Sequence, residues 1–252
     1  MCSSDLLALA RESLTIAWAL QALMFVWLGR RLSSPFLRQL GYVVFAITVF
    51  RLGAFEFPRF DTAAAAHGTM AAYWPAMVDR LWTFGLTIGA IAAAFFLERR
   101  AARDPSGACL PDTPDLLPAG LTRAAFFWSA VVLLFGYLHV ELFTMFGYLP
   151  LWRPAVLTLL WCAAGAAFLA LYLESGSPVH FGALCVFLAG ALLKSLLVDL
   201  AGWGARPGGY FGAEWSALQA FSRWTGFAVL LGLLAWVWRV GRGRGIDRKS
   251  VV

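Results

Sequence analysis

Charged residues are scarce in this sequence: they make up 13% of the 252 residues, whereas hydrophobic residues make up 61%. Soluble domains are about 25% charged and about 45–50% apolar, so the composition excludes an ordinary soluble domain. The mean hydropathy of +0.73 is that of a polytopic membrane protein. Segments of about ten residues with alternating polarity, which are typical of membrane β-barrels, do not occur in the sequence.

Cysteine and histidine are rare as well, with four and three residues respectively. No C-x-x-C spacing occurs and no histidines stand at metal-ligand spacing, so the sequence supports neither a zinc site nor a redox motif. Phosphate-binding glycine loops, the nucleophile elbow of hydrolases and the H-E-x-x-H motif are absent too. We therefore expect no metal, no cofactor and no catalytic residue. Cys162 and Cys185 fall in apolar runs, where we interpret them as buried structural thiols.

Long apolar runs are abundant instead. A helix needs about 20 apolar residues to cross the roughly 30 Å hydrocarbon core of a bilayer. Inside lipid, backbone groups must satisfy their own hydrogen bonds, which favours helices. The runs predict seven transmembrane helices, at about 13–29, 36–55, 80–97, 123–147, 154–173, 179–198 and 218–239. The predicted fold is therefore all-α, a polytopic transmembrane helical bundle that forms a single integral membrane domain over residues 7–246.

One long segment of the chain recurs. Residues 14–56 match residues 157–199 without a gap, and the same offset continues into the following helix of each half. The corresponding pairs are Leu14/Leu157, Thr15/Thr158, Trp18/Trp161, Phe25/Phe168, Ser34/Ser177, Pro35/Pro178, Arg51/Lys194, Glu56/Asp199, Arg80/Arg223, Phe84/Phe227, Gly89/Gly232 and Arg99/Arg242. Because corresponding helices are four spans apart, both halves have the same orientation. We predict two parallel three-helix repeats, at about 14–99 and 157–242, joined by a connecting helix at about 123–147.

The two ends of the chain resemble foreign sequence. Residues 1–6 and 247–252 are what a common sequencing adapter and its reverse complement would encode. We therefore expect both hexapeptides to be adapter-derived artefacts, which are set aside in reasoning about the fold. On this interpretation the natural protein continues beyond both ends, and the chain is a fragment.

The distribution of Lys and Arg between the connections predicts the orientation, since cytoplasmic loops carry the excess of basic residues. Ten such residues lie on one side, at Arg30, Arg31, Arg38, Arg99, Arg100, Arg103, Arg123, Arg239, Arg242 and Arg244. The opposite side carries five, at Arg11, Arg59, Arg80, Arg153 and Arg206. We therefore predict that the C-terminal tail is cytoplasmic.

Six charged residues fall near the ends of predicted helices that this orientation places at the outer leaflet. A charge at the centre of a bilayer costs about 3 kcal/mol, so such residues usually face a bundle interior or a cavity. A layer of this kind would suit an anionic headgroup or a sugar phosphate. The candidate ligand-binding residues are Arg51, Glu56, Glu141, Lys194, Asp199 and Arg223.

A purely structural interpretation of these charges is also open. Arg and Lys close to a helix end can extend to the interface at little cost, and cations near a helix C-terminus complement its dipole. Arg51 and Glu56 are five residues apart, about 140° around an α-helix, so the spacing predicts partners on other helices. Glu141 is either a proton-relay or ligand residue, or a salt-bridge partner of Lys194 or Arg223.

Several short strings form a further pattern. In the first half they are AWAL at 17–20, VWLGRR at 26–31, FLR at 36–38 and RL at 51–52, and in the second half LKSLLVDL at 193–200. This set resembles the large bacterial family of predicted membrane proteins called domain of unknown function 2339. The resemblance implies a multi-pass protein of a bacterial inner (plasma) membrane, built from repeated hairpins. The family has no established activity, so no catalytic residue is carried over. This chain is far shorter, as expected of a fragment.

Three function classes follow from these observations. The first is binding or translocation of an anionic amphipathic envelope component, a lipid or a sugar phosphate, at the outer-leaflet polar layer. The second is a structural membrane scaffold in which the charges lock helices together. The third is a membrane-embedded transferase with Glu141 or Asp199 as base, which the lack of a sizeable loop domain disfavours. We expect membrane lipids and no nucleic acid as partners, while the sequence leaves the oligomeric state open.

Overall fold

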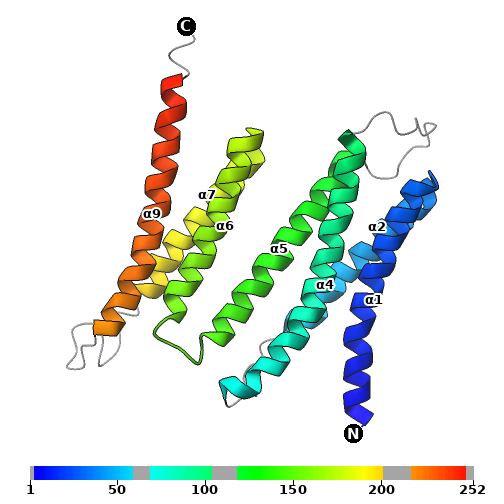
Figure 1. Cartoon of the computed structure of the whole chain (residues 1–252), viewed down its shortest axis with the longest axis horizontal. Helices are drawn as coiled ribbons and strands as arrows, with labels where there is room; N and C mark the ends of the chain where they lie inside the picture. Colours follow the sequence, from blue (N-terminus) through cyan, green and yellow to red (C-terminus); the bar gives the residue numbers. More distant parts are fainter. Residues whose placement is uncertain (1–2, 59–68, 104–117, 201–216, 248–252) are drawn as a thin grey trace. The chain divides into compact units, whose positions relative to one another are not determined.

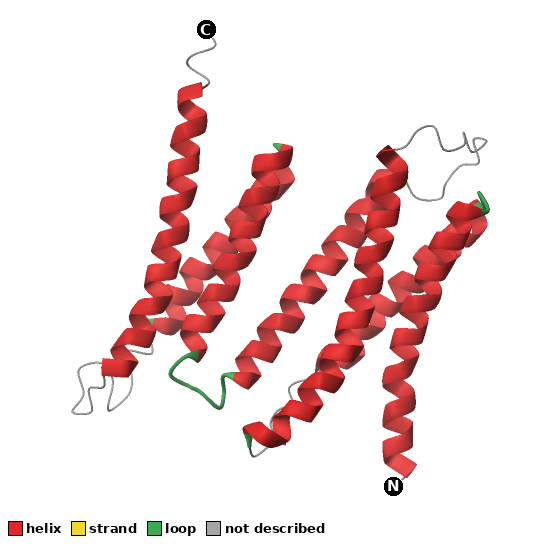
Figure 2. Cartoon of the chain, viewed as in Figure 1, coloured by secondary structure: helices red, strands yellow, loops and turns green. Residues whose placement is uncertain are grey.

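The computed structural model describes residues 3–58, 69–103, 118–200 and 217–247 (Figure 1). These residues form seven α-helices and two π-helical segments (Figure 2). In chain order they are α1 (Ser3–Arg31), α2 (Pro35–Arg51), η1 (Leu52–Glu56), α4 (Met70–Arg103), α5 (Ala119–Met145), α6 (Arg153–Ser175), α7 (Pro178–Leu193), η2 (Lys194–Asp199) and α9 (Ala217–Asp247). For the described residues, the prediction of an all-α fold is confirmed.

Six helical segments of the described chain are long and apolar enough to cross a membrane, as expected of a multi-pass membrane protein. They are Pro35–Glu56, Met70–Ala101, Gly120–Met145, Arg153–Ser175, Pro178–Asp199 and Ala220–Arg242. The remaining predicted span, at about 13–29, is helical within α1 but is not among the six. The uncharged stretch between Glu12 and Arg30 is shorter than the about 20 residues that a span typically needs.

Helices α2 and α7 begin and end in the same way. Each has a serine at the N-cap and a proline at the first helical position, Ser34-Pro35 and Ser177-Pro178. Proline suits this position because its missing N–H would have no partner there and its φ angle is already helical. Each helix then continues into a π-helical segment, η1 or η2.

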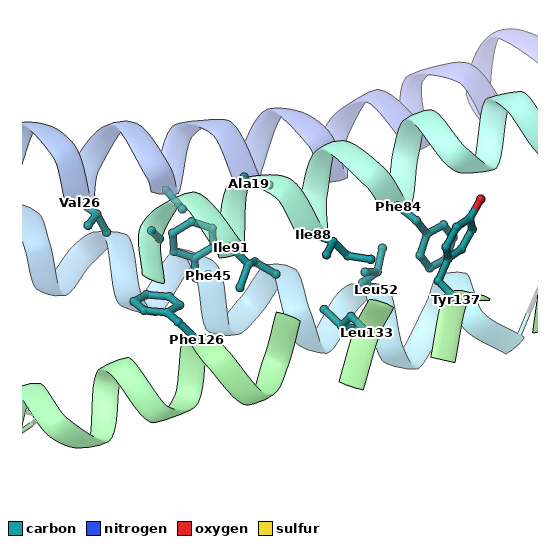
Figure 3. Close-up of a cluster of buried hydrophobic side chains, with 13 residues drawn as sticks. Ala19, Val26, Phe45, Leu52, Phe84, Ile88, Ile91, Phe126, Leu133 and Tyr137 are labelled. Atoms are coloured by element: carbon teal, nitrogen blue, oxygen red, sulfur yellow. The ribbon is translucent and has the colours of Figure 1, made fainter. Parts of the chain in front are cut away.

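The described residues belong to two compact units, divided between Val140 and Glu141. In the first unit, α1 packs against α2 and α4, and α5 contributes aromatic side chains to the same core. The ring of Phe84 on α4 stacks on Tyr137 of α5 at 5.1 Å (Figure 3). Phe126 of α5 meets Phe45 of α2 edge-on at 5.2 Å. The helix predicted as a connector therefore forms part of the first core.

In the second unit, α6 packs against both α7 and α9. Its core contains Cys162, Ala191, Leu230 and Leu233, so the prediction of a buried thiol is confirmed for Cys162. The prediction is wrong for Cys185, which is exposed. The two preceding residues of α7 are buried, and the rotation of the helix then carries the thiol to its outer face. In a membrane protein that face meets lipid, where an apolar thiol is as stable as in a core.

One carboxylate joins three helices of the first unit. Glu98 of α4 is 4% exposed and accepts two hydrogen bonds from the Arg30 guanidinium of α1, one of them at 3.0 Å from Nε to Oε1. The Tyr42 hydroxyl of α2 donates to the same Oε1 at 2.8 Å. The buried negative charge is thus matched by a cation and a further donor, as burial of a carboxylate requires.

The closest helix packing in the second unit involves a glycine. A Cβ atom added at Gly190 of α7 would lie 2.1 Å from Cζ3 of Trp161 on α6, so the indole occupies the space that any side chain there would need. In the repeat alignment the corresponding residues of the first unit are Ile47 and Trp18. Because Ile47 has a side chain, an indole cannot lie on it in the same way.

This packing predicts that Gly190→Ala destabilises the protein. The added methyl group must displace the Trp161 ring, and overpacking of this kind costs about 1–3 kcal/mol. Thermal unfolding in detergent micelles measures the change. The matched control is Gly182→Ala on the same helix, where nothing lies within 4 Å of an added Cβ; it should leave stability unchanged or raise it by up to about 1 kcal/mol. Equal effects of the two substitutions would contradict the packing argument.

Candidate functional site

The second unit contains a closed polar network around the ammonium group of Lys194. Its Nζ donates to the carbonyl oxygen of Pro154 at 2.9 Å and to the Thr158 hydroxyl at 2.9 Å. The same Nζ lies 2.7 and 3.0 Å from the two carboxylate oxygens of Asp199. Thr158 is fully buried, and its hydroxyl lies 3.1 Å from the Pro154 carbonyl and 3.3 Å from the Asp199 carboxylate. The ammonium therefore has an acceptor for each of its protons.

Lys194 and Asp199 are five residues apart, the same spacing for which the sequence argument on Arg51 and Glu56 expects partners on other helices. Residues five apart on an α-helix diverge by about 140°, which predicts partners on other helices. In the structure these residues are the first and last of the π-helical segment η2, and i→i+5 hydrogen bonds bring residues five apart onto one face. The bond from Leu200 N to Ser195 O, 2.9 Å long, is of this type. The α-helical spacing argument made for Arg51 and Glu56 therefore does not apply to this pair, which lies on a π-helical segment.

The corresponding residues of the first unit are arranged differently. The guanidinium of Arg51 lies over the indole of Trp18, with Cζ 5.2 Å from the ring centroid, a favourable cation–π geometry. Glu56 ends the π-helical segment η1. Its Oε1 atom is buried and has no hydrogen-bond partner within the described part of the chain, and the same holds for the hydroxyl of Thr15.

The other two candidate residues lie on α5 and α9. Glu141 of α5 is 6% exposed, and Arg223 of α9 is half-buried. Both take part in polar or electrostatic interactions. Of the six candidates, the structure joins Lys194 and Asp199 directly.

A second feature, which the sequence reasoning missed, is an apolar groove in the first unit. It has a volume of about 790 Å³ and lies between α1 and α4. Its lining residues are Leu20, Leu23, Met24, Trp27, Ala93, Phe96, Leu97, Arg99 and Arg100. The α1 residues follow the i, i+3, i+4, i+7 spacing of a single helix face, a signal that could have identified the α1 wall.

The groove is positively charged at one end. Arg99 and Arg100 are exposed there, and Arg31 of α1 lies over the ring of Trp27, 5.4 Å from its centroid. The neighbouring acid, Glu98, is already paired with Arg30. Since Glu98 is neutralised internally, it does not cancel the charge of the two exposed arginines.

No protein family, curated protein or solved structure matches this chain. The resemblance to domain of unknown function 2339 therefore stays a prediction based on short motifs. The features of the described residues that bear on function are the groove between α1 and α4, the network around Lys194 and the residues around Arg51.

The closed network predicts that Thr158→Val lowers stability more than Thr48→Val does. Thr158 bridges Lys194 and Asp199, and loss of hydrogen bonds to charged groups should cost about 1–3 kcal/mol. Thr48 is equally buried, but its hydroxyl bonds only to the Val44 carbonyl of its own helix, so its loss should cost less than about 1 kcal/mol. Thermal unfolding of both variants in micelles measures the difference, and equal losses would mean that the network does not stabilise the unit.

Proposed function

We propose that this protein is a non-enzymatic membrane protein that binds an anionic amphipathic lipid in the groove between α1 and α4. The observation that carries the proposal is the combination of an apolar groove with two exposed arginines at one end. An acyl chain would lie along the apolar wall, and the phosphate of the headgroup would meet Arg99 and Arg100.

The apolar part of the groove fits this ligand in size and chemistry. Its volume of about 790 Å³ falls within the roughly 300–1,000 Å³ of typical small-molecule sites. Met24 and Phe96, on opposite walls, are 57% and 58% exposed, so contact with an acyl chain would cover substantial apolar surface. Each buried CH₂ group contributes about 0.8 kcal/mol relative to water, although competition with bulk lipid makes the apolar part unselective.

Selectivity would therefore come from the arginines. A guanidinium can form two parallel hydrogen bonds with a phosphate and is weakly hydrated, which makes Arg well suited to this contact. Basic residues near a membrane surface each contribute about 1 kcal/mol toward anionic lipid. A zwitterionic phosphatidylcholine carries a compensating cation and should bind less well.

The position of the arginines in the groove also predicts at which side of the membrane the ligand binds. Arg99 and Arg100 belong to the group of residues that the Lys/Arg distribution predicts to be cytoplasmic. We therefore propose an inner-leaflet lipid of a bacterial inner membrane for the groove. The outer-leaflet layer, for which the sequence suggests a translocated envelope component or sugar phosphate, remains a proposal for Arg51, Glu56, Glu141 and Arg223.

A structural role is a second proposal, for the network around Lys194. All the acceptors of this ammonium group come from the same unit, so the group is engaged without any ligand. This favours a function in locking α6 to α7. The second unit would then act as a structural scaffold in which the charges lock helices together.

We also propose that the two units are copies of one three-helix element. Three observations support this. The proline starts of α2 and α7 and the acidic ends of η1 and η2 keep the offset of the sequence alignment. In each unit the first helix packs against both the second and the third.

The lipid proposal predicts that changing both Arg99 and Arg100 to Gln weakens binding of phosphatidylglycerol. Loss of two basic contacts worth about 1 kcal/mol each should reduce the affinity roughly 10–100-fold, while the apolar wall stays intact. Native mass spectrometry of the protein in micelles, titrated with phosphatidylglycerol or phosphatidylcholine, measures both lipids.

The control for this experiment removes the same charge elsewhere. Arg239 and Arg242 are exposed on α9, and changing both to Gln should leave phosphatidylglycerol binding unchanged. A further variant, Ala93→Trp, fills the groove and should reduce binding of both lipids. Equal binding by the Arg99/Arg100 and Arg239/Arg242 variants would refute the proposal.

A further inference from the structure

The first unit contains two buried oxygen atoms that the fold leaves without a partner. Thr15 is 0% exposed, and neither its hydroxyl nor Oε1 of Glu56 has a hydrogen bond to any described residue. An unsatisfied buried polar group costs about 1–3 kcal/mol, and native proteins keep few of them. A small polar species between them, such as a water molecule or an ion, would satisfy both oxygens.

Thr15 is an exception among the buried threonines. Thr48, Thr83, Thr87, Thr122 and Thr158 each donate their hydroxyl to the carbonyl four residues earlier in the helix. This is the usual solution for a threonine inside an apolar helix. The Thr15 hydroxyl does not take it, so its oxygen lone pairs and its proton are both available to another group.

The helix geometry places Thr15 and Glu56 in one layer. Trp18 of α1 and Arg51 of α2 are in contact, and α1 and α2 form a hairpin through a tight turn. Thr15 lies three residues before Trp18 on α1, which is nearly one turn and the same face. Glu56 lies five residues after Arg51, one turn of the π-helical segment. Because the helices are antiparallel, both steps lead in the same direction.

The second unit indicates what such a pair can hold. The corresponding residues, Thr158 and Asp199, lie 3.3 Å apart and share the ammonium group of Lys194. In the first unit the lysine is replaced by Arg51, whose guanidinium lies over Trp18. The threonine and the acid are therefore kept at the corresponding positions of the first unit, while the lysine whose ammonium group joins them in the second unit is replaced by an arginine.

We infer that Thr15 and Glu56 bind a compact monovalent cation, Na⁺ or K⁺, at the position that corresponds to the Lys194 ammonium. Carboxylate, hydroxyl and carbonyl oxygens are the ligands of hard cations, and Na⁺ sites of this kind are known beside irregular helix segments in membrane proteins. A single carboxylate balances one positive charge, which disfavours Ca²⁺, whose sites combine several carboxylates. The inference is independent of the lipid groove, because neither Thr15 nor Glu56 lines it.

The test is a comparison of melting temperatures in detergent micelles containing NaCl, KCl or choline chloride at equal ionic strength. Choline is too large for the cradle formed by Thr15 and Glu56, so it sets the baseline. A cation that binds only the folded state, at tenfold its dissociation constant, should raise the melting temperature by about 3–6 °C. The arms with Na⁺ and K⁺ identify which of the two ions fits.

Two variants remove the cradle and a third fills it. Thr15→Val and Glu56→Gln should abolish the difference between the salts. Arg51→Lys should place an ammonium group in the cradle, as Lys194 does, so that the variant melts higher in choline and no longer responds to Na⁺ or K⁺. Thr48→Val, which changes a buried threonine with its own partner, should keep the full response.

Arg51→Lys keeps the inference testable even when Thr15→Val or Glu56→Gln fails to fold. Identical melting temperatures of the unmodified protein in all three salts would overturn the inference. So would a salt response that persists in Arg51→Lys. Phosphatidylglycerol binding in the same micelles reports separately on the groove, so failure of one proposal is distinguishable from failure of the other.

Discussion

The cost of placing charge among apolar helices is the constraint on which this structure depends. An isolated ion in such surroundings is strongly destabilised, and only a matched partner with further hydrogen bonds offsets that cost. Glu98 has Arg30 and Tyr42, and Asp199 has Lys194 and Thr158. Each of these clusters joins side chains from different helices of its unit by hydrogen bonds.

The apolar pattern predicts much of the fold, because helix formation in lipid follows from length and hydropathy alone. The spans predicted from about 36 and 179 correspond to helices that begin at Pro35 and Pro178. The Lys194–Asp199 pair was not predictable in this way, because it requires a π-helical turn and the sequence pattern assumes α-helical spacing. Nor was the exposure of Cys185, because in a membrane protein an apolar residue can face either the core or lipid.

The groove illustrates a further limit of the sequence pattern. Arg99 and Arg100 by themselves indicate only a basic flank at the end of a span. Their chemical meaning depends on Glu98, which is buried against Arg30 and therefore does not neutralise the two exposed arginines next to it. The relation between these neighbours along α4 is set by tertiary packing, and only the structure separates the neutralised charge from the exposed ones.

The polar cluster around Lys194 differs from the one around Arg51, and this contrast follows from two sequence differences between the units that act together. At the position of Gly190, where the indole of Trp161 packs, the first unit has Ile47, which excludes an indole from that place. At the position of Lys194 it has Arg51, whose planar guanidinium stacks on aromatic faces, whereas an ammonium group is compact enough to lie among the four oxygens that Lys194 contacts. The Arg51 guanidinium accordingly lies over the Trp18 ring, whereas the Lys194 ammonium contacts both Thr158 and Asp199. The same residue types at corresponding positions thus form a closed network in the second unit and, in the first, leave the Thr15 hydroxyl and Oε1 of Glu56 without a hydrogen-bond partner among the described residues.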